Sequence, residues 1–160
     1  MLKRSHHFPR LILNRVNALT TDTAYRVTVK EGRAADLVVS FVNSLTALSS
    51  ELEGRHYGGG VLELVPSEIE KVLVPVGEHP ANGLPDLDRS VRAGMPAEEL
   101  LARQDEFLLK SIGVRKADRD ALRAAWIRLR LRRQRATTDA ADVEDHAGQG
   151  DPIRSASGRR

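Results

Sequence analysis

The sequence predicts an α+β fold: a small mixed sheet with one amphipathic helix over about residues 36–53, then a C-terminal pair of helices and a disordered tail. Two observations carry this prediction. Short runs of strand-forming residues flank a stretch with helical apolar periodicity, and two more periodic stretches follow a segment rich in glycine and proline. A chain of 160 residues is long enough for one domain with its own core, plus appendages.

Strand formers occur in three short runs. Residues 11–13 and 25–29 are rich in Leu, Ile, Val and Tyr and are separated by a polar segment, so they predict two strands joined by a loop. Residues 61–65 alternate in the same way and predict a third strand.

The central helix is predicted from its apolar spacing. Apolar residues recur at intervals of four, four, three and four, which places them on one helical face: Leu37, Phe41, Leu45, Leu48 and Leu52. We expect Asp36 to cap the helix at its start and Gly54 to follow its end.

After residue 65 the pattern predicts smaller pieces and then a division of the chain. Pro66 begins a short helical turn, and Pro75 keeps the residues before it extended. The division that we expect is an α+β module over residues 1–78, a glycine- and proline-rich linker over 79–96, a helical hairpin over 97–136 and a disordered tail over 137–160. The hairpin comprises one helix from 97 to about 112 and another from 116 or 118 to about 135.

Basic residues are concentrated in the second helix of this hairpin. The net charge is only +3, but between residues 115 and 135 the basic residues are Arg115, Lys116, Arg119, Arg123, Arg128, Arg130, Arg132, Arg133 and Arg135, against Asp118 and Asp120. This asymmetry suits a phosphate-rich partner. It equally suits a packed helix with a solvated arginine face, or a helix that docks another protein.

Composition excludes several classes of site. The chain has no cysteine, which excludes disulfides and thiolate chemistry and agrees with a cytoplasmic location. No apolar run reaches the ~20 residues of a membrane span, so we expect no membrane partner. The five histidines lack ligand-like spacing, and we expect no metal site.

Three successive glycines, Gly58, Gly59 and Gly60, lie between Arg55-His56-Tyr57 and the predicted third strand. Without side chains the backbone adopts conformations that other residues avoid, and a partner can approach it closely. A flexible connector is the plain alternative.

This run belongs to a longer pattern. Asn43-Ser44-Leu45-Thr46, then Gly54-Arg55-His56-Tyr57-Gly58-Gly59-Gly60-Val61-Leu62-Glu63-Leu64, Pro66-Ser67-Glu68-Ile69 and Leu73-Val74-Pro75 resemble the C-terminal region of adenine-specific DNA methyltransferases of the restriction-modification type. The resemblance implies a part of the enzyme in or beside the region that recognises the DNA target. It covers the first half of the chain well and the helical part more loosely.

The catalytic half of such an enzyme is absent from the sequence. We find no glycine-rich cofactor turn and no Asn-Pro-Pro-Tyr type motif that would hold a flipped adenine. The resemblance therefore implies no catalytic residues here, inactivity of the isolated chain, and S-adenosylmethionine bound by a separate catalytic domain or subunit.

The residues expected to bind double-stranded DNA are Arg55, His56, Tyr57, Gly58, Gly59, Gly60, Arg15, Arg26, Asn43 and Ser44. Each has a structural alternative. Arg55 could pair with Glu51 or Glu63, and Tyr57 could cap the core. Arg15 and Arg26 could lie on a solvated sheet face, and Asn43 and Ser44 could form only local hydrogen bonds. The alternative function is a non-catalytic protein-interaction module that docks through the basic C-terminal helix.

Overall fold

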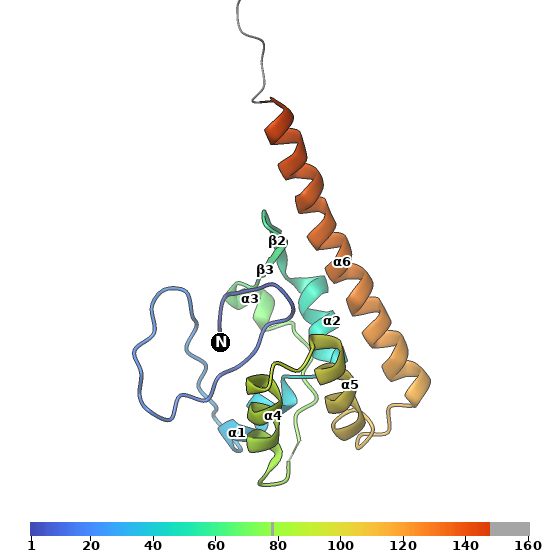
Figure 1. The fold of residues 1–160 in the computed structure, drawn as a ribbon. Coiled ribbons are helices and arrows are strands. Elements are labelled where there is room, and N and C mark those ends of the chain that lie inside the picture. The colour runs from blue at the N-terminus through green and yellow to red at the C-terminus, as the bar shows by residue number, and fades with distance from the viewer. Residues whose placement is uncertain (78, 148–160) are drawn as a thin grey trace, which may run out of the picture.

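The fold is α+β, as predicted. A computed structural model describes residues 1–77 and 79–147, with side chains to Arg135, and contains a three-stranded sheet and six helices in these residues (Figure 1). The strands are β1 (Arg4–Ser5), β2 (Arg55–Tyr57) and β3 (Val61–Glu63), in the order β1-β3-β2. Both pairings are antiparallel, so the prediction of a mixed sheet was wrong.

The strands predicted over residues 11–13 and 25–29 are absent. Residues 9–33 have no strand or helix beyond an isolated bridge between Leu2 and Ala24. Residues 23–25 lie beside the chain just before β1 instead: the Lys3 N–H donates to the Thr23 carbonyl oxygen at 3.0 Å and the Tyr25 N–H donates to that of Met1 at 2.8 Å, a contact too short to form a strand. We call residues 9–33 the N-terminal loop. The third prediction is confirmed, since β3 covers Val61–Glu63.

The single central helix is divided in two: α1 (Ala34–Ser40) and α2 (Ser44–Glu53). The break comes at Asn43, whose extended backbone and side-chain bond to the Thr46 N–H make it the N-cap of α2. Asp36 is therefore not a cap: it lies in the first turn of α1 and pairs with Arg33 at 2.7 Å.

Gly54 ends α2, as expected, but for a packing reason. Its backbone is extended, with φ −80°, so it needs no left-handed conformation. A Cβ at this position would lie 2.6 Å from Leu62 Cδ1 and 2.8 Å from the Ser50 carbonyl oxygen. Glycine lets α2 pass directly against β3.

The predicted linker contains a helix. After the short α3 (Pro66–Ile69), α4 spans Gly83–Arg92, and its Leu87 is buried in the main core. Two helices follow as predicted: α5 (Ala97–Phe107) and α6 (Lys116–Ala147). The backbone of α6 is helical well beyond residue 135, so the predicted tail is helical as far as Ala147, and its remainder lies outside the described residues.

One core joins the segments that the sequence had divided. It is formed by residues from just before the N-terminal loop through α6: Phe8, Val39, Val42, Ala47, Leu87, Leu100, Leu101, Leu108 and Trp126. A smaller cluster of Met1, Phe41, Leu64 and Val72 lies beside the sheet. Each fully buried leucine such as Leu101 contributes about 1.5–3 kcal/mol. The helical pair is therefore part of the same body as the sheet.

Helix α6 packs against α2 and α5 along the first part of its length (Figure 1). Three ion pairs join it to α5 in antiparallel register: Arg119 with Glu106 at 2.6 Å, Arg123 with Asp105 at 3.2 Å, and Arg130 with Glu98. Much of the basic charge of α6 is thus neutralised inside the molecule.

Candidate nucleic-acid interface

The β2–β3 hairpin presents its tip to solvent. The side chains of Arg55 and His56 are 58% and 50% exposed, and Tyr57 is 46% exposed. Gly58 and Gly59 at the turn are exposed, and a Cβ on Gly58 would meet no atom within 4 Å. The prediction of an accessible backbone is consistent with this geometry for Gly58 and Gly59 but wrong for Gly60, which is buried and therefore not placed to bind DNA.

Arg55 and Tyr57 have partners other than those considered from the sequence. Arg55 Nε pairs with Glu68 at 2.6 Å. Glu63, which lies opposite Arg55 on β3, pairs with Arg4 instead, and Glu51 pairs with Arg133. Glu68 also accepts a bond from the Val65 N–H at 2.9 Å, and this bond, followed by that from Arg55, lowers the pKa of Glu68. Arg4 lies 5.6 Å from the ring centre of Tyr57, so the ring faces a cation at the surface instead of capping the core.

Gly60 differs from its neighbours because it is buried against α6. A Cβ here would lie 3.1 Å from Gln134 Cα, and the backbone has φ +64°, a conformation that favours glycine. Arg133 donates to the Gly60 carbonyl oxygen, to that of His6 at 3.1 Å, and to both oxygens of Glu51 at 2.7 and 3.0 Å. The buried Arg133 thereby ties the tip of the hairpin to α6.

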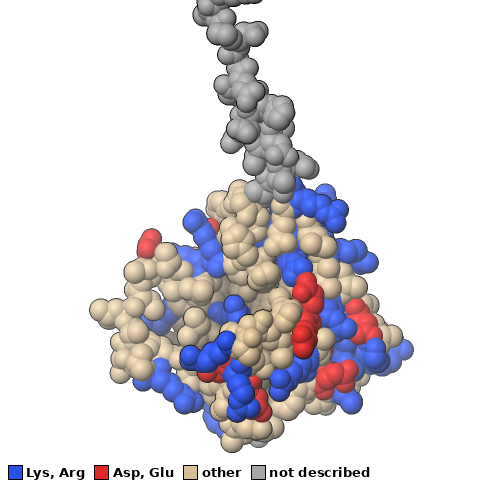
Figure 2. All heavy atoms as spheres, viewed as in Figure 1, with Lys and Arg blue, Asp and Glu red and all other residues tan. Residues whose placement is uncertain are grey.

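The arginines of α6 fall into two sets. Arg119, Arg123, Arg130 and Arg133 each face a carboxylate. The outer set, which we call the α6 arginine row, consists of Arg128, Arg132 and Arg135 at spacings of four and three; all are exposed and none has a hydrogen bond or ion pair in the described part of the chain. Figure 2 shows Lys and Arg side chains gathered over α6 at the upper right of the molecule.

A second group of unpaired cations lies in the N-terminal loop. Arg15, Arg26 and Lys30 are exposed and, like the α6 arginine row, lack a hydrogen bond, ion pair or ring contact within the described residues. Together these two groups make up every arginine and lysine without a partner among the described side chains. Since no sheet forms there, Arg15 and Arg26 lie on a loop and not on a sheet face.

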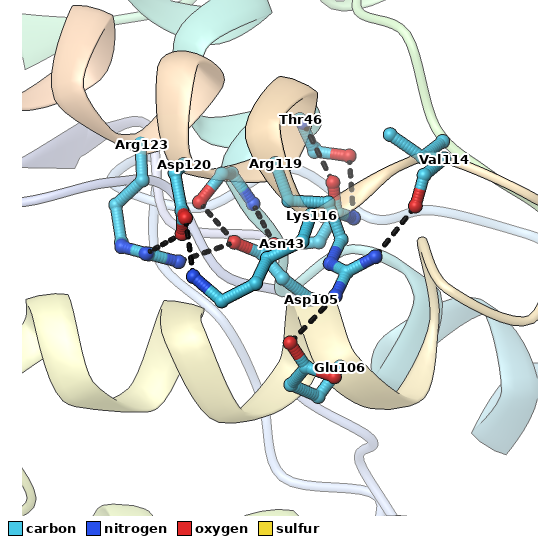
Figure 3. Close-up of polar contacts among 10 residues, drawn as sticks. Asn43, Thr46, Asp105, Glu106, Val114, Lys116, Arg119, Asp120 and Arg123 are labelled. Atoms are coloured by element: carbon cyan, nitrogen blue, oxygen red, sulfur yellow. Dashed lines mark hydrogen bonds and ion pairs between the residues drawn. The ribbon is translucent and has the colours of Figure 1, made fainter.

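Asn43 and Ser44 are buried and cannot contact a duplex at the surface, so their assignment to DNA binding was wrong. Both have 0% exposure. Asn43 accepts from the Thr46 N–H at 2.9 Å (Figure 3). It also donates to the Ser40 carbonyl oxygen at 2.7 Å, and the Ser44 hydroxyl donates to Asp105 at 2.6 Å. The local-bonding alternative is the one that the structure supports.

Asp105 is the residue at this junction that sequence analysis missed. Its carboxylate accepts from the Ser44 N–H at 2.8 Å, so an anion lies at the N-terminus of α2, where the helix dipole stabilises it. Burial raises the pKa of Asp105, against the opposing hydrogen bonds from Ser44 and Arg123. Its direct neighbours Gln104 and Glu106 are polar, and only its helical spacing from Leu101 and Leu108, four residues before and three after, indicated that it would be buried.

Comparison with protein-family models assigns the chain to a class of methyltransferase domains. Residues 1–109 match the family model described as Type II methyltransferase M.Eco57I, C-terminal domain, so the chain belongs to this family. No curated protein and no solved structure matches. The match ends just beyond α5, which leaves α6 outside it.

In residues 1–77 and 79–135, whose side chains are described, no cluster of three or more histidine or acidic side chains could hold a metal ion. Within residues 1–77 and 79–147, no helix combines the length and apolar character that a bilayer span requires.

Proposed function

We propose that the chain is the DNA-contacting, target-recognition part of a site-specific adenine-N6 DNA methyltransferase of the restriction-modification type. Catalysis and S-adenosylmethionine binding belong to a separate domain or subunit, and the complex works on double-stranded DNA in the cytoplasm. The family match supports descent from such an enzyme. The observation that supports DNA contact is the exposed glycine hairpin held beside the unpaired α6 arginine row.

The hairpin and the row are adjacent because of Gly60. Its closest neighbour is Gln134, which lies between Arg132 and Arg135 in the sequence. The row therefore ends next to the hairpin tip. From Arg128 to Arg135 the helix rises about 10 Å, at 1.5 Å per residue. This length matches about three base-pair steps of 3.4 Å, so the guanidinium groups can follow successive phosphates.

The hairpin supplies the complementary chemistry. N–H groups of the exposed Gly58 and Gly59 can approach phosphate oxygens, because no side chain stands in front of them. Tyr57 offers an aromatic ring at the surface that can stack on a base that has left the helix. Arg55 and His56 add donors on the same strand.

The direct test is equilibrium binding of a fluorescent DNA duplex by the full chain over a series of salt concentrations. Wild type should bind, with affinity falling steeply as salt rises. The triple variant R128Q/R132Q/R135Q should bind more weakly and lower the slope of log K against log salt by about 2–3, at about 0.9 per phosphate contact.

A matched control removes the same charge elsewhere. Arg89, Arg92 and Arg115 are equally exposed but paired with aspartates on α4 and α6. R89Q/R92Q/R115Q should bind DNA within about twofold of wild type, since its arginines are already compensated. Absence of DNA binding by the wild-type chain even at low salt would refute the proposed function.

The protein-interaction alternative rests on the same α6 arginine row, which could dock an acidic protein surface. It predicts that the row variant keeps wild-type DNA binding but loses capture of a partner protein. The hairpin favours DNA, because docking through α6 alone leaves no role for an exposed glycine turn.

A further inference from the structure

We infer that the apex of the N-terminal loop, residues 14–19, is a second DNA-contacting element that reads base edges and so determines target sequence. This inference rests on the proposed function and deepens it. Three observations support it: the charge of the loop, the exposed apolar side chains at its apex, and the hydrogen bonds that fix the apex.

Charge favours a nucleic acid over a protein as the partner of this loop. Residues 9–33 contain five basic residues, Arg10, Arg15, Arg26, Lys30 and Arg33, against two acidic ones, Asp22 and Glu31. Within the described structure Arg15, Arg26 and Lys30 share with the α6 arginine row the absence of any partner, whereas arginines such as Arg4, Arg55 and Arg89 are neutralised locally. Unpaired cations can contact a phosphate backbone without the cost of first breaking an ion pair, although their side chains still lose hydration and freedom on binding.

The apex exposes apolar side chains that the fold does not use. Leu19 is 97% exposed, Val16 83% and Ile12 67%. The loop stands off the body and leaves a cavity of about 250 Å³ between itself and residues of α1, including Leu37 and Val38. Exposed aliphatic groups flanked by arginine are suited to a groove, where they can contact thymine methyl groups.

The apex is fixed in shape although it has no regular secondary structure. The Asn14 side chain closes it by donating to the Ala18 carbonyl oxygen at 2.9 Å and accepting from the Ala18 N–H at 3.0 Å. Within this turn Asn17 has φ +50°, a left-handed conformation that asparagine tolerates. Arg15 and Asn17 are thus presented on a closed turn, and these are the side-chain types that form paired hydrogen bonds with guanine and adenine.

Backbone bonds attach the loop to the sheet that carries the hairpin. The Lys3 N–H donates to the Thr23 carbonyl oxygen at 3.0 Å, and the Lys3 carbonyl oxygen accepts from the Leu64 N–H at 3.2 Å. The loop therefore continues from the same sheet as the hairpin, in the same body as the α6 arginine row. In this inference, a duplex bound at the hairpin contacts the apex as a second, separate point.

Selection of preferred duplexes from a randomised pool by the full chain tests this inference. Wild type should enrich a defined sequence. R15A/N17G, in which glycine preserves the left-handed backbone at residue 17, should lose the preference at one or two adjacent base pairs, with discrimination there falling about tenfold. The R128Q/R132Q/R135Q variant should bind all sequences more weakly and keep the preference.

The outcomes separate this inference from the proposed function. If R15A/N17G enriches the same sequence as wild type, the apex does not read sequence, while the proposed function stands. If wild type binds DNA with no preference, the inference and target recognition both fail, and only DNA contact stands. If wild type binds no DNA, both fail. If R15A/N17G keeps the preference and V16S/L19S instead abolishes co-purification with a methyltransferase catalytic domain, the apex is a protein-docking surface and the inference is wrong.

Discussion

Replacing Arg133 by methionine should strongly destabilise the chain and release the hairpin from α6. The side chains of Arg133 and Glu51 are both 0% exposed, and the two are joined by paired hydrogen bonds at 2.7 and 3.0 Å. Removing one partner of a buried ion pair costs about 3–5 kcal/mol, because the other charge remains uncompensated. The carbonyl oxygens of Gly60 and His6 would also lose a donor, which adds about 1–3 kcal/mol for each that water cannot reach.

The measurement is urea unfolding followed by the fluorescence of Trp126, the only tryptophan, which is 0% exposed in the fold. R133M should lower the free energy of unfolding by at least about 3 kcal/mol, a large part of the 5–15 kcal/mol typical of a domain. The double variant E51Q/R133M should lose less than R133M alone, because it leaves no buried charge. A loss below about 1 kcal/mol in R133M, or a double variant less stable than the single one, would refute this account of the pair.

Two further predictions concern the hairpin turn and the α5–α6 contact. In the same urea assay, G60A should lower the free energy of unfolding by about 1–2 kcal/mol because the backbone at Gly60 is left-handed, and by more because the new Cβ would meet Gln134. G58A should stay within about 0.5 kcal/mol of wild type. Equal effects of the two variants would contradict the packing of Gly60. The hydrogen bond from Arg130 is the main cause that lowers the pKa of Glu98 in the folded chain. The bond to ionised Glu98 therefore stabilises the fold fully above the ordinary glutamate pKa, and this stabilisation is lost as the pH falls through the lowered pKa of the folded state. The stability gap between wild type and E98Q should therefore be full at pH 7 and shrink below about pH 4; a gap that stays constant with pH would show that this bond does not act through the charge of Glu98.

The sequence pattern correctly predicted those helix ends that are determined by residues close by in the chain. Lys116 begins α6 as expected, and Gly54 ends α2. The division at Asn43 was missed because the apolar period continues across it. What ends α1 there is a competing side-chain cap together with Asp105, a carboxylate 61 residues away from Ser44.

Elements that depend on distant partners were predicted poorly. The runs at 11–13 and 25–29 have strand-forming composition, but in the described residues the one bridge near them joins Leu2 to Ala24, so no strand follows from it. The segment 79–96 has the composition of a linker, yet Leu87 within it finds a place in the main core. The density of glycine and proline indicates local flexibility, but it does not indicate whether an apolar side chain such as Leu87 packs into the core.

For the candidate interface, the sequence located the hairpin but not its support. Arg55, His56 and Tyr57 are exposed as a surface site requires. The residue that fixes the hairpin, Arg133, is 82 positions from Glu51, and no periodicity links the two. Asn43 and Ser44 belong to the same family pattern as the hairpin, but they are buried and fix the N-terminus of α2.

Which arginines of α6 are buried and which are exposed decides how DNA binding and protein docking can be told apart. In sequence, Arg132 and Arg133 look equivalent, and charge reversal at Arg128, Arg132 and Arg133 is an obvious way to remove the basic face of α6. Arg133 is only 4% exposed and holds Glu51, so its reversal would place two carboxylates together in the interior and unfold the chain. Loss of any partner would then follow from loss of structure. With Arg135 in place of Arg133, every substituted residue is exposed and unpaired in the described structure, and a change in DNA or protein binding reports on the surface itself.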